Sequence, residues 1–259
     1  MKLAAFVTVL ALAAPAGVGG QVARQVADVE DGTVRFSYET KPGVEICDQG
    51  IRWGERTMWW RTRGGEDDRG TGCSQRLAEV ELRVRRGIVR EVEVVRSERD
   101  RSARATDLGE IPARQAASYL LSLATDGADA DGAEEAIMPA MLADAGDIWR
   151  DVIDIAEDRS VDGSVRKSAL FWLGQEAAEV VTEGLAGVAL DEDEDQEIRD
   201  AAIFALSQRP AAEGVPILME LAKEGDGAET RKKAMFWLAQ SGDDRVVDFF
   251  ESILIGRNR

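Results

Sequence analysis

The sequence contains no histidine among its 259 residues. Histidine is the commonest general base near neutral pH, a member of the usual catalytic triads and a frequent zinc ligand, so its absence excludes those sites. Carboxylate-only chemistry stays open, but no carboxylate pair is distinguished as a glycosidase site. The sequence also lacks a phosphate-binding glycine loop, a nucleophile elbow and a zinc motif. We therefore expect no enzyme, and no catalytic residue, cofactor or metal ion.

Cysteine is scarce: Cys47 and Cys73 are the only two. Two thiols cannot complete a tetrahedral zinc site without further ligands, and histidine is not available to supply them. In an oxidising compartment an isolated pair of cysteines usually bonds. We therefore predict a Cys47–Cys73 disulfide, which on the chain-entropy view of cross-links would contribute roughly 3–4 kcal/mol.

Long apolar runs are absent except near the start of the chain. There Lys2 precedes an apolar run from Leu3 to Ala14, and Ala14-Pro15-Ala16 has the small-x-small pattern of a cleavage site, with a second candidate at residues 18–20. The run is too short to span a bilayer as a mature helix, and no cysteine follows for a lipid anchor. We expect residues 1–20 to be a signal peptide, with an uncleaved anchor or a plain helix as the alternative. The mature protein would be periplasmic or extracellular and not inserted in a membrane.

Basic residues are outnumbered, 32 against 49 acidic ones, which gives a net charge of -17. The imbalance lies in one half: residues 21–110 carry 17 basic and 18 acidic side chains, whereas residues 111–259 carry 14 and 31. Nucleic acid and anionic membranes need basic surfaces, so neither is expected as a partner. The acidic half is either a solubilising surface or a negative face that attracts a basic protein.

Residues 21–96 have the alternating pattern of β-strands. Thr33–Glu39 alternates, 57–61 is a second candidate, and 78–85 and 88–96 form a hairpin around Arg86-Gly87. Strict alternation places Ile88, Arg90, Val92 and Val94 on one face of the second arm and Val89, Glu91 and Glu93 on the other. We predict a small antiparallel β domain over residues 21–96 that contains the disulfide, followed by a polar linker over residues 97–110.

Trp59 and Trp60 are adjacent in the second strand candidate. In a strand they point to opposite faces, so one can be core while the other is exposed or covered by the C-terminal half. An exposed tryptophan can stack on a sugar or anchor a partner protein. The alternative is that it packs where the two halves of the chain meet.

Three strings in the C-terminal half are versions of one another. VRKSALFWLGQ begins at Val165, IRDAAIFALSQ at Ile198 and TRKKAMFWLAQ at Thr230, so the starts are 33 and 32 residues apart. A fixed period of this size is typical of a solenoid, in which each repeat buries its apolar face against its neighbours. Each repeat reads as two helices, and weaker copies precede it. We predict about four helical hairpins over residues 111–259.

These strings resemble the HEAT repeat family, in the short bacterial form also seen in phycobilisome-lyase-like HEAT proteins. Val165, Arg166, Ala169, Leu173 and Gly174 match its pattern best. The resemblance covers about residues 132–255. It implies an α+β chain whose second part is an α-α superhelix, and a scaffold that binds a protein on an extended concave surface. A lyase would attach bilins, but no residue set for that reaction is present. A glycan- or small-ligand-binding protein acting through the N-terminal tryptophans is the alternative.

Two rows of residues recur in the repeats. Phe171, Phe204 and Phe236 either pack between the paired helices or form an exposed aromatic stripe for a ligand. The second row is Gln175, Gln208 and Gln240, which either satisfies free backbone groups at the helix ends or forms a polar ladder in a binding groove. We take both rows, with Trp59 and Trp60, as candidate partner-binding residues.

Overall fold

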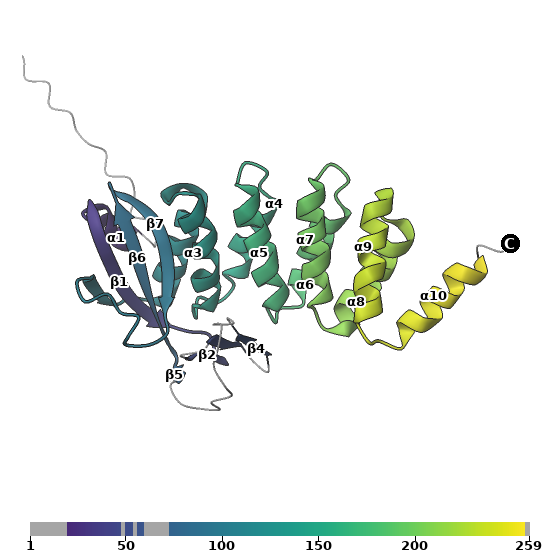
Figure 1. Cartoon of the computed structure of the whole chain (residues 1–259), viewed down its shortest axis with the longest axis horizontal. Coiled ribbons are helices and arrows are strands. Elements are labelled where there is room, and N and C mark those ends of the chain that lie inside the picture. Colours follow the sequence, from purple (N-terminus) through teal and green to yellow (C-terminus); the bar gives the residue numbers. More distant parts are fainter. Residues whose placement is uncertain (1–19, 48–49, 54–55, 60–72, 257–259) are drawn as a thin grey trace, which may run out of the picture.

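The computed structural model describes residues 20–47, 50–53, 56–59 and 73–256. For residues 56–59, 74–75 and 254–256 it describes the backbone alone. The chain is elongated, with strands at one end and a row of helices that extends to the C-terminus (Figure 1). This is an α+β fold in two parts, as predicted, and the second part is a helical repeat.

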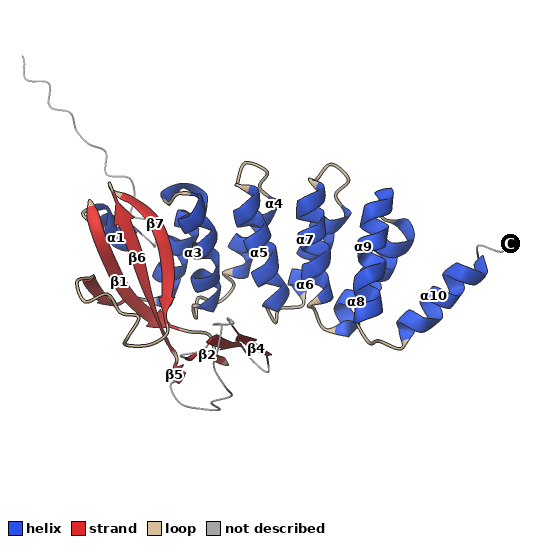
Figure 2. Cartoon of the chain, in the orientation of Figure 1, coloured by secondary structure: helices blue, strands red, loops and turns tan. Residues whose placement is uncertain are grey.

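The described residues contain eight strands, ten α-helices and one short π-helix, joined by loops and turns (Figure 2). The strands are β1 (Asp31–Glu39), β2 (Val44–Cys47), β3 (Gly50–Trp53), β4 (Arg56–Trp59), β5 (Cys73–Gln75), β6 (Leu77–Arg85), β7 (Ile88–Val95) and β8 (Thr106–Glu110). The helices are α1 (Gly20–Ala27), α2 (Ala113–Ser122), the short π-helix η1 (Leu123–Gly127), α3 (Ala130–Leu142), α4 (Trp149–Glu157), α5 (Gly163–Gln175), α6 (Val180–Leu190), α7 (Gln196–Ser207), α8 (Ala211–Glu224), α9 (Gly227–Gln240) and α10 (Arg245–Gly256). None of these helices has the length and apolar character needed to cross a membrane.

The first sheet has the strand order β7-β6-β1-β8. β1, β6 and β7 pair antiparallel, whereas β8 pairs parallel with β1, so the sheet is mixed and not purely antiparallel as expected. β8 lies inside residues 97–110, which we expected to be a linker. Residues 106–110 lack the apolar alternation that predicts a strand, because β8 is largely exposed. β8 is a strand because it pairs with β1.

The hairpin of β6 and β7 turns where the sequence predicts. Arg86 and Gly87 both have positive φ, 55° and 72°, as the favoured two-residue hairpin turn requires. The alternation in the second arm is interrupted, however. Arg83 pairs with Glu91 but Val84 pairs with Val89, so Arg90 is an extra residue in a β-bulge. Val89 therefore joins Val92 and Val94 in the core, and the expectation that it shares a face with Glu91 is wrong.

The second sheet has the order β4-β3-β2-β5 and carries the disulfide. Cys47 of β2 lies directly opposite Cys73 of β5, with Cα atoms 3.9 Å apart, and the two side chains are bonded. The predicted disulfide is confirmed. The strand candidate at residues 57–61 corresponds to β4 up to Trp59; the side chain of Trp59 and all of Trp60 lie outside the described residues.

The first sheet and the helices share one apolar core. Phe36 and Tyr38 of β1 are fully buried, and Phe36 packs against Tyr119 of α2 with ring centroids 6.4 Å apart. The Tyr38 hydroxyl donates a 2.7 Å hydrogen bond to the carbonyl of Pro139 in the last turn of α3, and burial raises its pKa. Because the last carbonyls of a helix have no partner within it, this contact fixes the end of α3 to the sheet.

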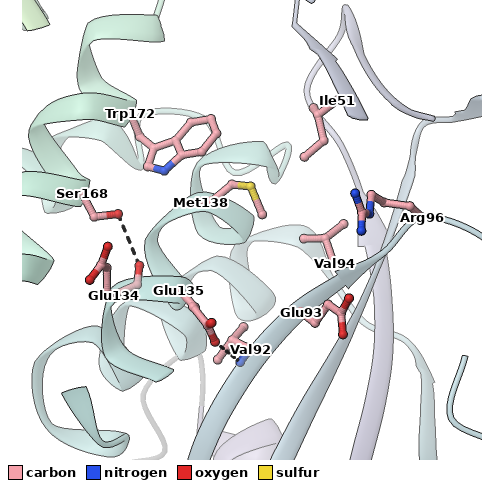
Figure 3. Close-up of a pocket in the computed structure, with 10 residues that line it drawn as sticks. All are labelled: Ile51, Val92, Glu93, Val94, Arg96, Glu134, Glu135, Met138, Ser168 and Trp172. Atoms are coloured by element: carbon pink, nitrogen blue, oxygen red, sulfur yellow. Dashed lines mark hydrogen bonds between the residues drawn. The ribbon is translucent and has the colours of Figure 1, made fainter. Parts of the chain in front are cut away.

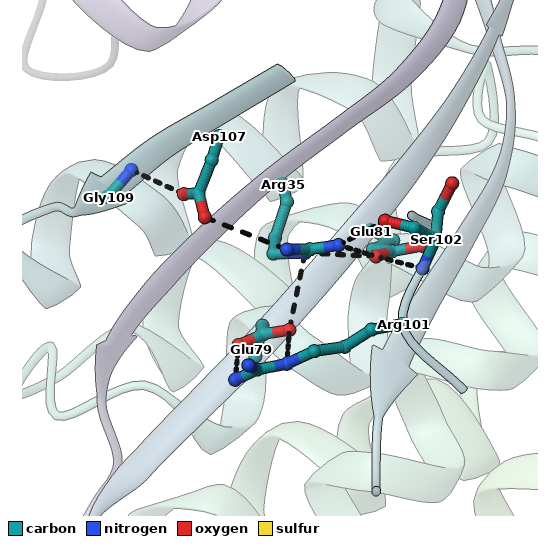
Figure 4. A network of polar contacts seen from close by, with 7 residues as sticks. All are labelled: Arg35, Glu79, Glu81, Arg101, Ser102, Asp107 and Gly109. Atoms are coloured by element: carbon teal, nitrogen blue, oxygen red, sulfur yellow. Dashed lines mark hydrogen bonds and ion pairs between the residues drawn. The ribbon is translucent and has the colours of Figure 1, made fainter. Parts of the chain in front are cut away.

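The outer face of the first sheet is polar and is covered by residues 97–105. Arg35 of β1 donates to Glu81 of β6 at 2.8 Å and to the carbonyl of Ser102 at 2.6 Å, while Arg101 pairs with Glu79 at 2.5 Å (Figure 4). The hydrogen bond to Glu81 raises the pKa of Arg35. These contacts hold the connection between β7 and β8 across the sheet.

The arginine that recurs at the start of each repeat is buried or half-buried, and in two of the three copies it caps a neighbouring helix. Arg166 of α5 donates to the carbonyl of Ala156 at the end of α4 (2.8 Å), and Arg231 of α9 donates to the carbonyl of Gly225 just after α8 (2.7 Å). Arg166 also pairs with Glu194 at 2.5 Å. A cation at the C-terminal end of a helix satisfies free carbonyls and complements the helix dipole, which accounts for the arginine in these two copies. Arg199 instead donates to Gln196 of its own helix at 2.8 Å.

Candidate partner-binding groove

A cavity of about 370 Å³ lies where the first sheet meets the repeats (Figure 3). Three parts of the fold form its walls: the second half of β7, β3, and the facing helices α3 and α5. The lining residues are Ile51, Val92, Glu93, Val94, Arg96, Glu134, Glu135, Met138, Ser168 and Trp172. Residues from both predicted parts of the chain therefore build it together.

The cavity has an apolar floor and an acidic rim. Ile51, Val94 and Trp172 are buried, and Met138 is half-buried beside them. The rim consists of solvent-exposed carboxylates and one cation: Glu93, Glu134, Glu135 and Arg96. Such a site favours an apolar group that carries a positive charge nearby.

Desolvation raises the pKa of Glu135, and the neighbouring carboxylates of Glu91, Asp131 and Glu93 raise it further. A hydrogen bond from the Val92 backbone N–H to the Glu135 carboxylate, 2.8 Å long, opposes this rise. The pKa of Glu93 is also raised, first by desolvation and then by Glu91. Carboxylates that repel one another in this way would be relieved by a cation bound between them.

The hollow continues from the cavity onto the face of the repeats. A second hollow shares Glu134, Ser168 and Trp172 with it and extends to Lys167 and Phe171 on α5. We call the two together the junction groove. Ser168 is half-buried in the shared part, where its hydroxyl donates to the carbonyl of Glu134 at 3.3 Å.

An aromatic row extends from the junction groove along the first helices of the repeats. Trp53 of β3 stacks on Trp172 of α5 (centroids 6.1 Å apart), Phe171 stacks on Phe204 of α7 (6.2 Å), and Phe204 contacts Trp237 of α9 (5.0 Å). Phe236 lies at the far end against Trp237 and is 53% exposed. The row comprises Trp53, Trp172, Phe171, Phe204, Trp237 and Phe236.

The three predicted phenylalanines thus lie in this row. Phe171 and Phe204 join α5 to α7, and Phe204 also contacts Trp237 of α9, whereas Phe236 contacts Trp237 of its own helix. Phe171 and Phe204 are half-buried, so one ring face or edge of each reaches the surface. A row of half-buried rings on a rigid scaffold is a surface that can hold apolar side chains of a partner.

The glutamine row is less uniform. Gln208 donates to the Ser207 hydroxyl at 3.0 Å, at the end of its own helix, while Gln240 is exposed and Gln175 is half-buried. The residues that sequence reasoning missed are the floor and rim of the cavity, above all Trp172, Met138, Glu93 and Glu135. Trp172 carries the apolar signal of an inward-facing residue, but only the fold shows that the sheet faces it.

Among the described residues, the one group of three side chains close enough to share a metal ion is Glu45, Cys47 and Cys73. Both sulfurs of this group belong to the disulfide, so thiolate ligands are not available there. The group therefore gives no support for a metal site.

Residues 185–257 match the family described as HEAT repeats. The match runs from the middle of α6 through α10 and includes two of the three repeat strings, which confirms the resemblance predicted from them. Residues 185–257 are therefore similar to HEAT repeats, and a small mixed sheet and further helices precede them. No curated protein is similar enough to the chain to be matched. HEAT repeats suggest an interaction scaffold.

Proposed function

We propose that the protein is an exported, non-catalytic scaffold that binds a basic protein partner along the junction groove and the aromatic row. The observation that most directly supports this proposal is that the acidic-rimmed cavity and the aromatic row meet at Trp172, which lines the cavity and stacks on Trp53. A partner could place apolar side chains on the rings while its cations lie near Glu93, Glu134 and Glu135. The acidity of residues 111–259 supports the same partner charge.

Export rests on the pattern of residues 1–20 and on the disulfide, since such bonds persist in oxidising compartments. Cleavage after Ala16 would leave α1 intact, and Val22 and Val26 of α1 are buried in the core. Mass spectrometry of the exported chain should show a new N-terminus near this site and no free thiol. Alkylation of two thiols without reductant would count against the export proposal.

Site-specific photocrosslinking tests the binding surface. A photoreactive amino acid at Ser168 lies in the junction groove, whereas one at Leu190 lies at the exposed end of α6 and outside it. We expect a discrete protein adduct from Ser168 and none from Leu190 in the compartment where the protein acts, with an adduct yield that falls as salt rises.

A matched pair of substitutions then tests the aromatic row. Phe236→Ser removes an exposed ring of the row, and Val247→Ser removes an exposed apolar side chain of α10 that is outside it. We expect the first to reduce the Ser168 adduct several-fold and the second to leave it unchanged. Equal adducts from Ser168 and Leu190, or no effect of Phe236→Ser, would refute binding on this face.

A further inference from the structure

β7 is an edge strand of the first sheet, because β6 covers only one of its sides. The start of its open side is closed by α3 and the residues before it. Val89 forms a bridge with Ala128, and its carbonyl accepts a 3.1 Å hydrogen bond from the Asp129 N–H. The Glu135 carboxylate then accepts the Val92 N–H at 2.8 Å. Proteins protect sheet edges from stray pairing in this way.

The second half of the same edge faces the cavity. The bond from the Val92 N–H to α3 shows that this group points away from β6. Backbone direction alternates along a strand, so the N–H and C=O of Val94 lie on the same side as those of Val92. Val92, Glu93, Val94 and Arg96 all line the cavity (Figure 3). The protection of the edge therefore ends where the cavity begins.

We propose that this half of β7, residues 92–95, pairs with an extended segment of the partner protein, which adds one strand to the first sheet. The proposal rests on the function proposed above and names its binding mode. Main-chain hydrogen bonds to Val94 would supply affinity, and side chains on the two faces of the added strand would supply specificity.

The side chains of β7 define the chemistry of that segment. On the inner face Val92 and Val94 lead to the apolar floor at Met138 and Trp172, so residues beside them should be apolar. On the outer face Glu91 and Glu93 carry negative charge, so the residues between should be basic. The fitting segment alternates apolar and basic residues.

A synthetic peptide of alternating lysine and valine, titrated calorimetrically into the full chain, is the probe. Its controls are a peptide of alternating glutamate and valine and one with the same lysines and valines grouped in two blocks. We expect the alternating basic peptide to bind at least 10-fold more tightly than either control. Peptide binding should also slow amide exchange at Val94 in the wild-type protein. Equal binding of the blocked peptide, or unchanged exchange at Val94, would overturn strand addition.

Val94→Pro removes the N–H that the added strand needs, and proline is tolerated on an open sheet edge. Val94→Ile keeps the N–H and serves as the matched control. Both variants change a buried core side chain, so urea unfolding first measures the stability of each. Under conditions in which both are folded, we expect Val94→Pro to bind the peptide at least 10-fold more weakly than Val94→Ile. Retained affinity in Val94→Pro overturns the pairing. If Val94→Pro still forms the Ser168 adduct with its partner, the groove function stands and only this binding mode fails.

Discussion

The indole of Trp53 stacks on the indole of Trp172 with 6.1 Å between ring centroids and 19° between ring planes. Lys41 lies over the Trp53 ring at 5.2 Å and also pairs with Glu176, just after α5. These contacts join the second sheet to the first complete HEAT-like repeat. They also set one wall of the junction groove, because it is lined by Trp172 and by Ile51, which lies in β3 together with Trp53.

Trp53→Ala should loosen the second sheet from α5. Loss of the ring stack and the cation–π contact is expected to cost roughly 1–3 kcal/mol. Hydrogen exchange should report faster opening of the β2 and β3 amides and little change in α7 to α9. Trp53→Phe keeps an aromatic face and should recover part of the protection. Unchanged exchange in β2 and β3 would show that the stack contributes nothing.

Arg166→Met should destabilise the repeats strongly. Arg166 and Glu194 are both at most 5% exposed at their side chains. Removal of Arg166 leaves this buried carboxylate with only the longer 3.7 Å contact to the half-exposed Arg159. Breaking such a pair typically costs about 3–5 kcal/mol. Urea unfolding measures the loss, and the double variant Arg166→Met, Glu194→Leu should recover much of it. A double variant as unstable as the single one would contradict this account.

The same pair predicts how stability depends on pH. Hydrogen bonds from Arg166 lower the pKa of Glu194, against the opposing effect of burial. A lowered folded-state pKa gives stability that is fully present above the unfolded-state pKa of about 4.3 and is lost as pH falls through the lower folded-state value. The melting temperature of the wild-type protein should therefore decrease as the pH drops below about 4. The melting temperature of the double variant should decrease less over the same range. Parallel pH curves for the two proteins would disprove the linkage.

Two glycines of the repeats should respond oppositely to alanine. A Cβ at Gly187 in α6 would meet nothing within 4 Å, so Gly187→Ala should gain up to about 1 kcal/mol of helix propensity. At Gly174 in α5 a Cβ would lie 3.0 Å from the carbonyl oxygen of Ala205 in α7, so the helices must move apart. Thermal melts should show a rise of about 2–4 °C for the first variant and a fall for the second. A rise for both would mean that α5 and α7 separate at no cost.

Glu135→Gln should weaken binding of the alternating lysine–valine peptide without weakening the fold. The amide oxygen can still accept the Val92 N–H, while the negative charge at the groove rim is lost. The folded state raises the pKa of Glu135, so ionisation of Glu135 lowers the free energy of unfolding as pH rises above the ordinary glutamate pKa. The Glu135→Gln variant has no charge at this position and does not lose this stability.

Peptide affinity of the wild-type protein should also fall on acidification, starting at a higher pH than for an ordinary glutamate, since the pKa values of Glu93 and Glu135 are both raised. Titration calorimetry between pH 7 and pH 5 measures this. A pH-independent affinity, or a Glu135→Gln variant that binds as tightly as wild type, would show that the rim charge takes no part.

The repeat strings and the hairpin were predictable because their signals are local. Val165, Ala169 and Leu173 repeat at helical spacing and recur in the next copies, and Arg86-Gly87 can adopt the positive φ values of a tight turn. The disulfide followed from counting, since two cysteines allow only one pairing within the chain. Each of these conclusions depends on residues that are close in sequence or few in number.

The groove depended on contacts that no local pattern contains. The bulge at Arg90 places Val89 in the core, and β8 pairs with β1 in parallel. The second half of β7 and Trp172 line the same cavity. Periodicity in the sequence tells which side of a helix or strand is buried, but not which other element covers it. The sequence by itself determined the helical repeats, the hairpin and the disulfide. Only the tertiary structure decided that β7, α3 and α5 enclose one acidic-rimmed cavity, because that depends on pairings between residues far apart in the chain.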